Sequence, residues 1–79
     1  MSYREVVSHI VNRLRKKESQ NKIKKGTADF VYNDLTHEKS LHHEQLKAEL
    51  KTAEKVNDVI KTWVAFYSSY YMQQLFKFK

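Results

Sequence analysis

Proline is absent from this chain of 79 residues, and its one glycine is Gly26. Proline and glycine are the residues that most often interrupt helices and shape the tight turns between strands. No two alternating apolar and polar runs are joined by a hairpin-type turn, so the sequence predicts no sheet. We therefore expect long helical stretches with few enforced breaks, and an all-α fold class.

The length of the chain limits how much surface it can bury. A domain of this size buries only roughly 60% of the surface that its unfolded chain exposes, so a large enzyme scaffold is excluded. No cysteine is present, which excludes a disulfide framework and a thiolate metal cage. With 41% apolar and 30% charged residues the composition is that of a globular protein. One small three- to four-helix domain over residues 1–79 is expected.

Helix-capping residues and apolar spacing divide the chain. Ser2 and Glu5 form the pattern of a capping box at the start of the first helix. Gly26, which directly follows two lysines, is expected to end that helix, and Ser40 to cap the third. Asn57 is a natural break between the last two helices, although nothing forbids one continuous helix there, so both alternatives stay open. The predicted helices span about residues 3–18, 28–35, 41–56 and 58–76.

Positive charge is concentrated near the N-terminus. Residues 1–25 carry a net charge of +6, residues 26–58 carry −3, and residues 59–79 carry +3. Within residues 13–25 only Glu18 opposes seven cations, and such a run can neutralise the phosphates of a nucleic acid. We expect a nucleic-acid site there, although a plain solubilising helix face would look the same. The candidate residues are Arg13, Arg15, Lys16, Lys17, Lys22, Lys24 and Lys25.

Aromatic residues are concentrated in the predicted C-terminal helix. They form two stripes on it, and the predicted helix over residues 28–35 is too short to cover the second stripe. Exposed aromatic surface of that breadth is typical of an interface, although a central helix wrapped on both sides would also explain it. The sequence therefore predicts a homodimer or a protein partner docked on this helix. The candidate interface residues are Trp63, Phe66, Tyr67, Tyr70 and Tyr71.

Three histidines, His37, His42 and His43, lie close together but lack the spacing of a zinc-binding helix. We therefore expect no metal and no cofactor. A helix-turn-helix is a weaker alternative, because two predicted helices follow each other after a short turn. Its recognition helix would expose His42, His43, Gln45, Lys47 and Glu49. The acids Glu44 and Glu49 on that helix would repel phosphates, which weakens this alternative.

No motif for nucleophilic catalysis and no glycine-rich phosphate loop is present, so we expect no enzyme. The apolar run over residues 59–78 is interrupted by polar side chains and predicts no transmembrane segment. Its polar face is rich in serine and glutamine, so a membrane-surface role is less favoured. A cytoplasmic location is expected. The leading hypothesis is a small basic regulatory or accessory protein, dimeric, that contacts nucleic acid; the alternative is a protein-interaction module such as an inhibitor, an antitoxin-like partner or an assembly subunit.

Overall fold

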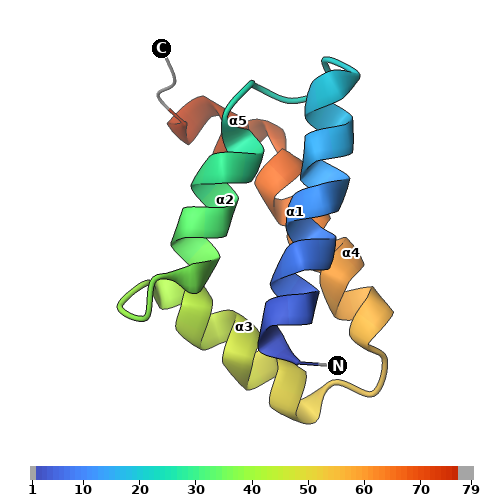
Figure 1. Cartoon of the computed structure of the whole chain (residues 1–79), viewed down its shortest axis with the longest axis vertical. Coiled ribbons are helices and arrows are strands. Elements are labelled where there is room, and N and C mark those ends of the chain that lie inside the picture. The colour runs from blue at the N-terminus through green and yellow to red at the C-terminus, as the bar shows by residue number, and fades with distance from the viewer. Residues whose placement is uncertain (1, 77–79) are drawn as a thin grey trace.

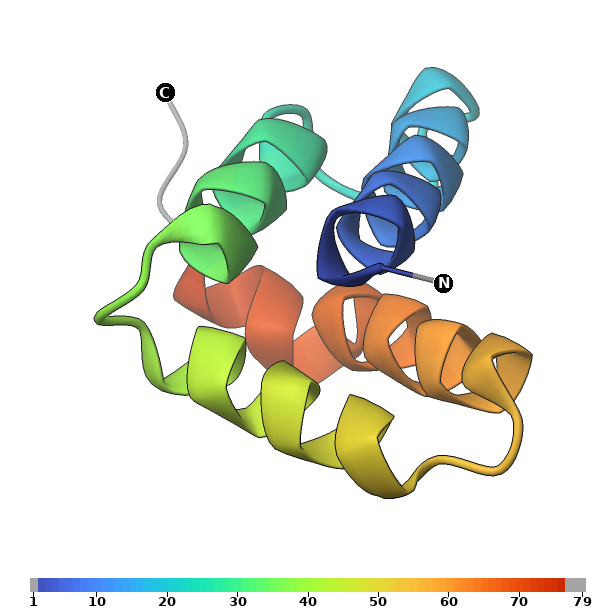
Figure 2. The same ribbon diagram turned by 60° about the horizontal axis from the view of Figure 1, so that its bottom comes forward.

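Five helices arranged in two layers make up the part of the chain that this computed structural model describes, residues 2–76 (Figures 1 and 2). One layer contains α1 beside α2, and the other contains α3 beside α4, with α5 beyond the end of α4. No strand occurs within residues 2–76, which confirms the all-α fold class there. Residues 1 and 77–79 of the predicted domain lie outside the described residues. The helices are α1 (Tyr3–Ser19), α2 (Thr27–Thr36), α3 (Leu41–Thr52), α4 (Val56–Ser68) and α5 (Tyr70–Leu75).

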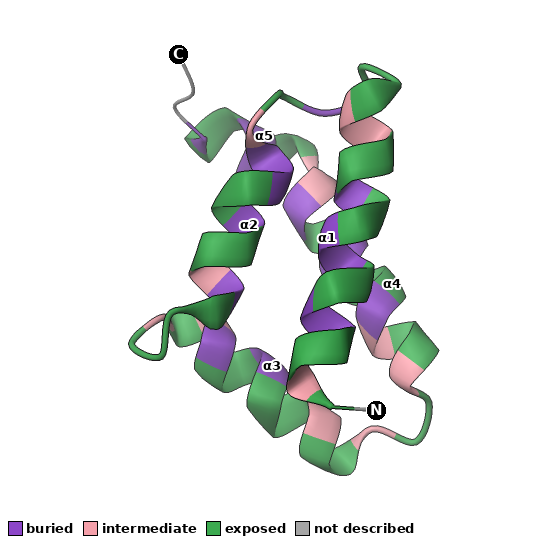
Figure 3. Ribbon diagram, viewed as in Figure 1, coloured by how far each residue is buried: buried purple, intermediate pink, exposed green. Residues whose placement is uncertain are grey.

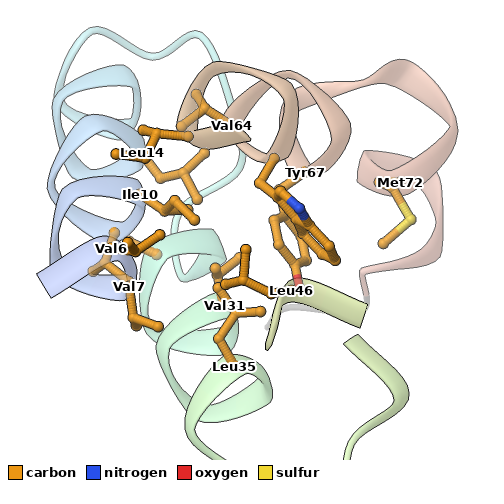
Figure 4. Packing of buried hydrophobic residues seen from close by; sticks show 14 of the residues in the cluster. Val6, Val7, Ile10, Leu14, Val31, Leu35, Leu46, Val64, Tyr67 and Met72 are labelled. Carbon is orange, nitrogen blue, oxygen red and sulfur yellow. The ribbon is translucent and has the colours of Figure 1, made fainter. Parts of the chain in front are cut away.

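The core lies between the two layers, where the buried side of each helix faces inward (Figure 3). The close view in Figure 4 shows side chains of α1 and α2 meeting those of α4. The predicted apolar stripe of α1 is confirmed as part of this core. The apolar spacing of residues 28–35 predicts that Phe30 is buried on α2, but Phe30 is 42% exposed. The fully buried large side chains include Val6, Val7, Ile10, Leu14, Val31, Leu35, Leu46, Ile60 and Tyr67.

The two ends of α1 are closed by different devices. At its start, Ser2 and Glu5 form the predicted capping box. At its end, Asn21 adopts a positive φ of 59°. The N–H of Asn21 then bonds the carbonyl of Glu18, and the N–H of Lys22 bonds that of Lys17, the pattern of a Schellman motif. The expectation that Gly26 ends this helix is therefore wrong: Gly26 has a positive φ of 92°, but it caps the start of α2.

The break between α3 and α4 lies at residues 53–55, earlier than the predicted break at Asn57. Asn57 is instead a helical residue in the first turn of α4. No glycine or proline enforces this break, so packing selects its position. A continuous helix would carry the apolar side of α4 away from α1, whereas the break lets α4 turn back beneath α1 and alongside α3 (Figure 2).

A second break separates α4 from α5, so the predicted continuous helix over 58–76 is wrong. Ser69 has extended backbone angles, and its hydroxyl accepts a hydrogen bond from the N–H of Met72 as the cap of α5. The chain changes direction at Ser69, which brings α5 towards the loop between α1 and α2. Within the described residues, no helix combines the length and apolar character required to cross a bilayer.

Candidate functional site

The seven predicted cations lie on the last turns of α1 and on the α1–α2 loop, residues 20–26 (top of Figure 1). We call residues 13–25 the basic segment. Six of its seven cationic residues are exposed, and Lys17 is half-buried. The structure therefore presents the charges of this segment to solvent at one end of the molecule.

The single acid of the basic segment, Glu18, does not offset these charges at the surface. Its carboxylate turns inward and accepts a hydrogen bond from the backbone N–H of Ala28, in the first turn of α2. A carboxylate at this position satisfies a free N–H and interacts favourably with the positive end of the helix dipole. Glu18 therefore links α1 to α2, and its negative charge stabilises the start of α2.

One ion pair involves the basic segment within residues 2–76. Arg15 lies 2.9 Å from a carboxylate oxygen of Asp29 on α2, and both side chains are largely exposed. An exposed pair of this kind contributes about 0–1 kcal/mol and leaves both groups accessible. The remaining six cations form no ion pair with the described residues, so an ion pair offsets only one of the seven positive charges of the segment.

The α1–α2 loop and the α4–α5 junction together form a shallow groove with a volume of about 520 Å³. We call it the Tyr70 groove. The loop supplies two lysines to one side, and α5 supplies an aromatic ring that is 81% exposed, that of Tyr70. Predicted cations and a predicted interface aromatic thus meet at one place. The groove is lined by Asn21, Lys22, Ile23, Lys24, Ser68, Tyr70 and Gln73.

The buried side chain of Gln73 holds the two sides of this groove together. Its carbonyl oxygen accepts a hydrogen bond of 2.8 Å from the N–H of Lys24. Its amide nitrogen donates to the carbonyl of Tyr67, at 3.0 Å, and to the hydroxyl of Thr27, at 3.3 Å. Sequence reasoning missed this residue, because a single glutamine among aromatic residues carries no periodic signal.

The predicted aromatic interface is divided by the structure. Trp63 is 5% exposed and Tyr67 is fully buried, so both belong to the core of the chain and offer no surface to a partner. Both were predicted to lie at an interface, but α3 covers the side of α4 that α1 and α2 leave free. Phe66 is partly exposed and packs edge-on against both of these rings. Tyr70 and Tyr71 are exposed on α5, as the interface prediction requires; contact with a partner stays a prediction.

A polar cluster centred on Asp34 joins α2, α3 and α4. Its carboxylate accepts hydrogen bonds from Ser40, at 2.7 Å, and from the hydroxyl of Tyr67, at 2.8 Å. The Nδ1 of His42 lies 2.6 Å from the same carboxylate and is the donor, because an ionised carboxylate only accepts. Burial raises the pKa of Asp34, but the hydrogen bonds from His42, Ser40 and Tyr67 and the charge of protonated His42 outweigh it, so this pKa lies below its usual value.

Half-buried Tyr3 and buried His43 close the end of α2. The hydroxyl of Tyr3 and the Nδ1 of His43 both donate to the carbonyl of Leu35, at 2.6 and 2.8 Å. Burial, with the nearby charges of Asp34 and Glu44, raises the pKa of Tyr3 to about 12. Burial and the hydrogen bond to Asp34 also raise the pKa of Tyr67.

The helix-turn-helix alternative does not fit these positions. His43 is buried and His42 is held by Asp34, so neither projects from α3 towards a DNA groove. The three histidines also diverge: His37 is exposed, and its Nδ1 accepts from the N–H of Lys39. Among residues 2–76 no three histidine or acidic side chains lie close enough to hold a metal ion.

No protein-family model, curated protein or solved structure matches this chain.

Proposed function

We propose that this chain is a small, basic, non-enzymatic regulatory or accessory protein that binds nucleic acid through its basic segment. The observation that carries the proposal is the hydrogen bond of Glu18 to the start of α2, which leaves six of the seven cations of the basic segment without an ion pair among the described residues. Six cations without an ion pair at one end of a small domain form a strong positive field. Phosphate oxygens are the ligands that such a field attracts.

Binding of this kind is driven mainly by the phosphate backbone. Each phosphate that a lysine or arginine neutralises releases condensed counterions, so the affinity falls steeply as salt rises. Contacts to phosphates fix the position of a protein but carry little sequence information. We therefore expect weak sequence preference and strong dependence on ionic strength.

The test compares two triple variants that remove the same charge from different layers of the fold. The first replaces Lys16, Lys22 and Lys25 by glutamine. The control replaces three exposed lysines of α3 and the following loop, Lys47, Lys51 and Lys55, by glutamine.

Binding of a labelled oligonucleotide is followed by anisotropy over a range of salt concentrations. We expect the first variant to lose affinity and to reduce the salt slope by about 2 to 3, since each lost phosphate contact removes roughly 0.7–0.9 from it. The control should keep most of the slope. Equal losses in both variants, or no binding by the wild type at low salt, would refute the proposal.

A second candidate function is association with another protein chain through α5. Tyr71 and Leu75 are 70% and 54% exposed, and they lie one helical turn apart on the same side of α5. Exposed pairs of this kind are typical of association surfaces. Sedimentation equilibrium of the wild type and of a Tyr71→Ser, Leu75→Ser variant tests it: a wild type that stays monomeric at high concentration rules out self-association.

A further inference from the structure

We infer that the nucleic acid bound by this protein is single-stranded and that one of its bases stacks on Tyr70. This inference rests on the proposed function and adds the class of nucleic acid and the residue that selects it. The relationship that carries it is the position of an exposed aromatic ring across a groove from Lys22 and Lys24. An aromatic face combined with a positive track for the backbone is the arrangement that binds single strands.

The exposure of Tyr70 is not explained by packing within the chain. Tyr70 is 81% exposed, while Met72 and Gln73, which follow it on the same helix, are buried. Leaving a large aromatic ring in water forgoes stabilisation that burial would give. The ring nevertheless lies beside the lysines of the α1–α2 loop. An anionic ligand with a flat apolar face can pair its charge with these lysines and stack its face on the ring.

The base of the groove offers polar groups as well. Gln73 is held in place by three hydrogen bonds, so the distance between the loop and α5 is fixed before any ligand binds. The hydroxyl oxygen of Ser68, which borders the groove, is buried and has no hydrogen-bond partner within the described structure. A buried polar atom without a partner is costly, and rotation of the Ser68 side chain towards a ligand in the groove would remove that cost.

A duplex cannot use this arrangement in the same way. Apart from the outer faces of its two terminal pairs, its bases are stacked on one another, so their faces are not available to a ring on a protein surface. A duplex would therefore contact the lysines of the basic segment but not the face of Tyr70. A substitution at Tyr70 should therefore change the affinity for single strands but not the affinity for a duplex.

The chain provides a matched control in the adjacent residue. Tyr71 is also an exposed tyrosine of α5, but it does not line the groove. Tyr70→Ala and Tyr71→Ala thus remove the same group from neighbouring positions, one inside and one outside the proposed site. Tyr70→Phe keeps the aromatic face and removes only the hydroxyl.

The experiment measures anisotropy of a labelled oligo(dT) and a labelled oligo(rU), each of about 12 nucleotides, and of a blunt DNA duplex of the same length, at low salt. We expect Tyr70→Ala to weaken single-strand binding roughly 5- to 150-fold, the effect of losing about one stacked base. Tyr70→Phe and Tyr71→Ala should bind both single strands like the wild type. Duplex affinity should be the same for all three variants and the wild type.

The outcomes separate this inference from the function on which it rests. If the wild type binds duplex as tightly as single strands and Tyr70→Ala leaves both unchanged, the inference is wrong while the proposed function stands. If the wild type binds neither single strands nor duplex, both are wrong. If Tyr71→Ala weakens single-strand binding as much as Tyr70→Ala, the base lies elsewhere on α5 and the assignment to the Tyr70 groove is overturned.

Discussion

The side-chain carbonyl of Gln73 accepts a hydrogen bond from the backbone N–H of Lys24, a residue 49 positions earlier in the chain. This bond joins the last helix to the loop that follows the first. Because the loop contains three of the seven predicted cations, the same bond determines where their positive charge lies relative to the exposed ring of Tyr70.

Replacing Gln73 by alanine should destabilise the fold. The change removes the partners of the partly buried N–H of Lys24 and of the carbonyl of Tyr67, and losing such hydrogen bonds costs ~1–3 kcal/mol of unfolding free energy. Urea unfolding followed by the fluorescence of Trp63, the only tryptophan, measures this cost. Gln74→Ala changes a neighbouring exposed glutamine and should stay within about 0.5 kcal/mol of the wild type. Equal stability of the two variants would contradict the role assigned to Gln73.

Glu18→Gln should lower stability by ~0.5–1 kcal/mol, because it removes a negative charge from the positive end of the α2 dipole. The measurement is thermal unfolding at low salt, where the dipole interaction is least screened. Glu38→Gln, in the exposed α2–α3 loop, removes the same charge without a helix start beside it. A loss that is as large in Glu38→Gln would show that the net charge of the chain, and not the position of Glu18, is responsible.

Asp34 should make stability depend on pH in the acid range. Its pKa is lower in the folded chain than in the unfolded chain, so its contribution is present above the unfolded value of ~3.9 and is lost as the pH falls through the folded value. Asp34→Asn should be less stable at neutral pH, and the difference from the wild type should shrink below about pH 4. Urea unfolding at a series of pH values measures it. In Glu54→Gln, an exposed control, the acid dependence of the wild type should persist.

Tyr3 should make stability depend on pH in the alkaline range. Its pKa rises to about 12 on folding, so its contribution is fully present below the unfolded value of ~10 and is lost as the pH rises towards 12. Tyr3→Phe loses the hydrogen bond to Leu35, about 1 kcal/mol at neutral pH, and should show a shallower alkaline decline. Circular dichroism between pH 8 and pH 12, with Tyr32→Phe as the exposed control, tests this. Parallel alkaline curves for Tyr3→Phe and the wild type would contradict it.

Periodicity and capping chemistry predict the parts of this fold that depend on nearby residues. The apolar spacing of α1 and the Ser2–Glu5 capping box are both local patterns, and both occur as expected. The end of α1 also carried a local signal that was overlooked: Asn21 is a residue type that tolerates positive φ.

Other features depend on residues that are distant in sequence. The α3–α4 break has no glycine or proline, so only the packing of α4 beneath α1 selects its position. The basic segment was found by its composition, but the inward turn of Glu18 depends on where α2 begins in space. The hydrogen bond between the side chain of Gln73 and the loop also depends on residues distant in sequence, because no pattern within α5 indicates that Lys24 is the partner.

The two walls of the Tyr70 groove come from segments made at very different times during synthesis. A ribosome releases the chain from its N-terminus, so residues 21–24 emerge before residues 68–73. A nascent chain that stops short of Tyr70 already displays the lysines of the loop but lacks the stacking ring and the glutamine that anchors it. On the proposed function, charge attraction to nucleic acid would therefore precede the ability to hold a single base, which would arise only when the last helix has been made.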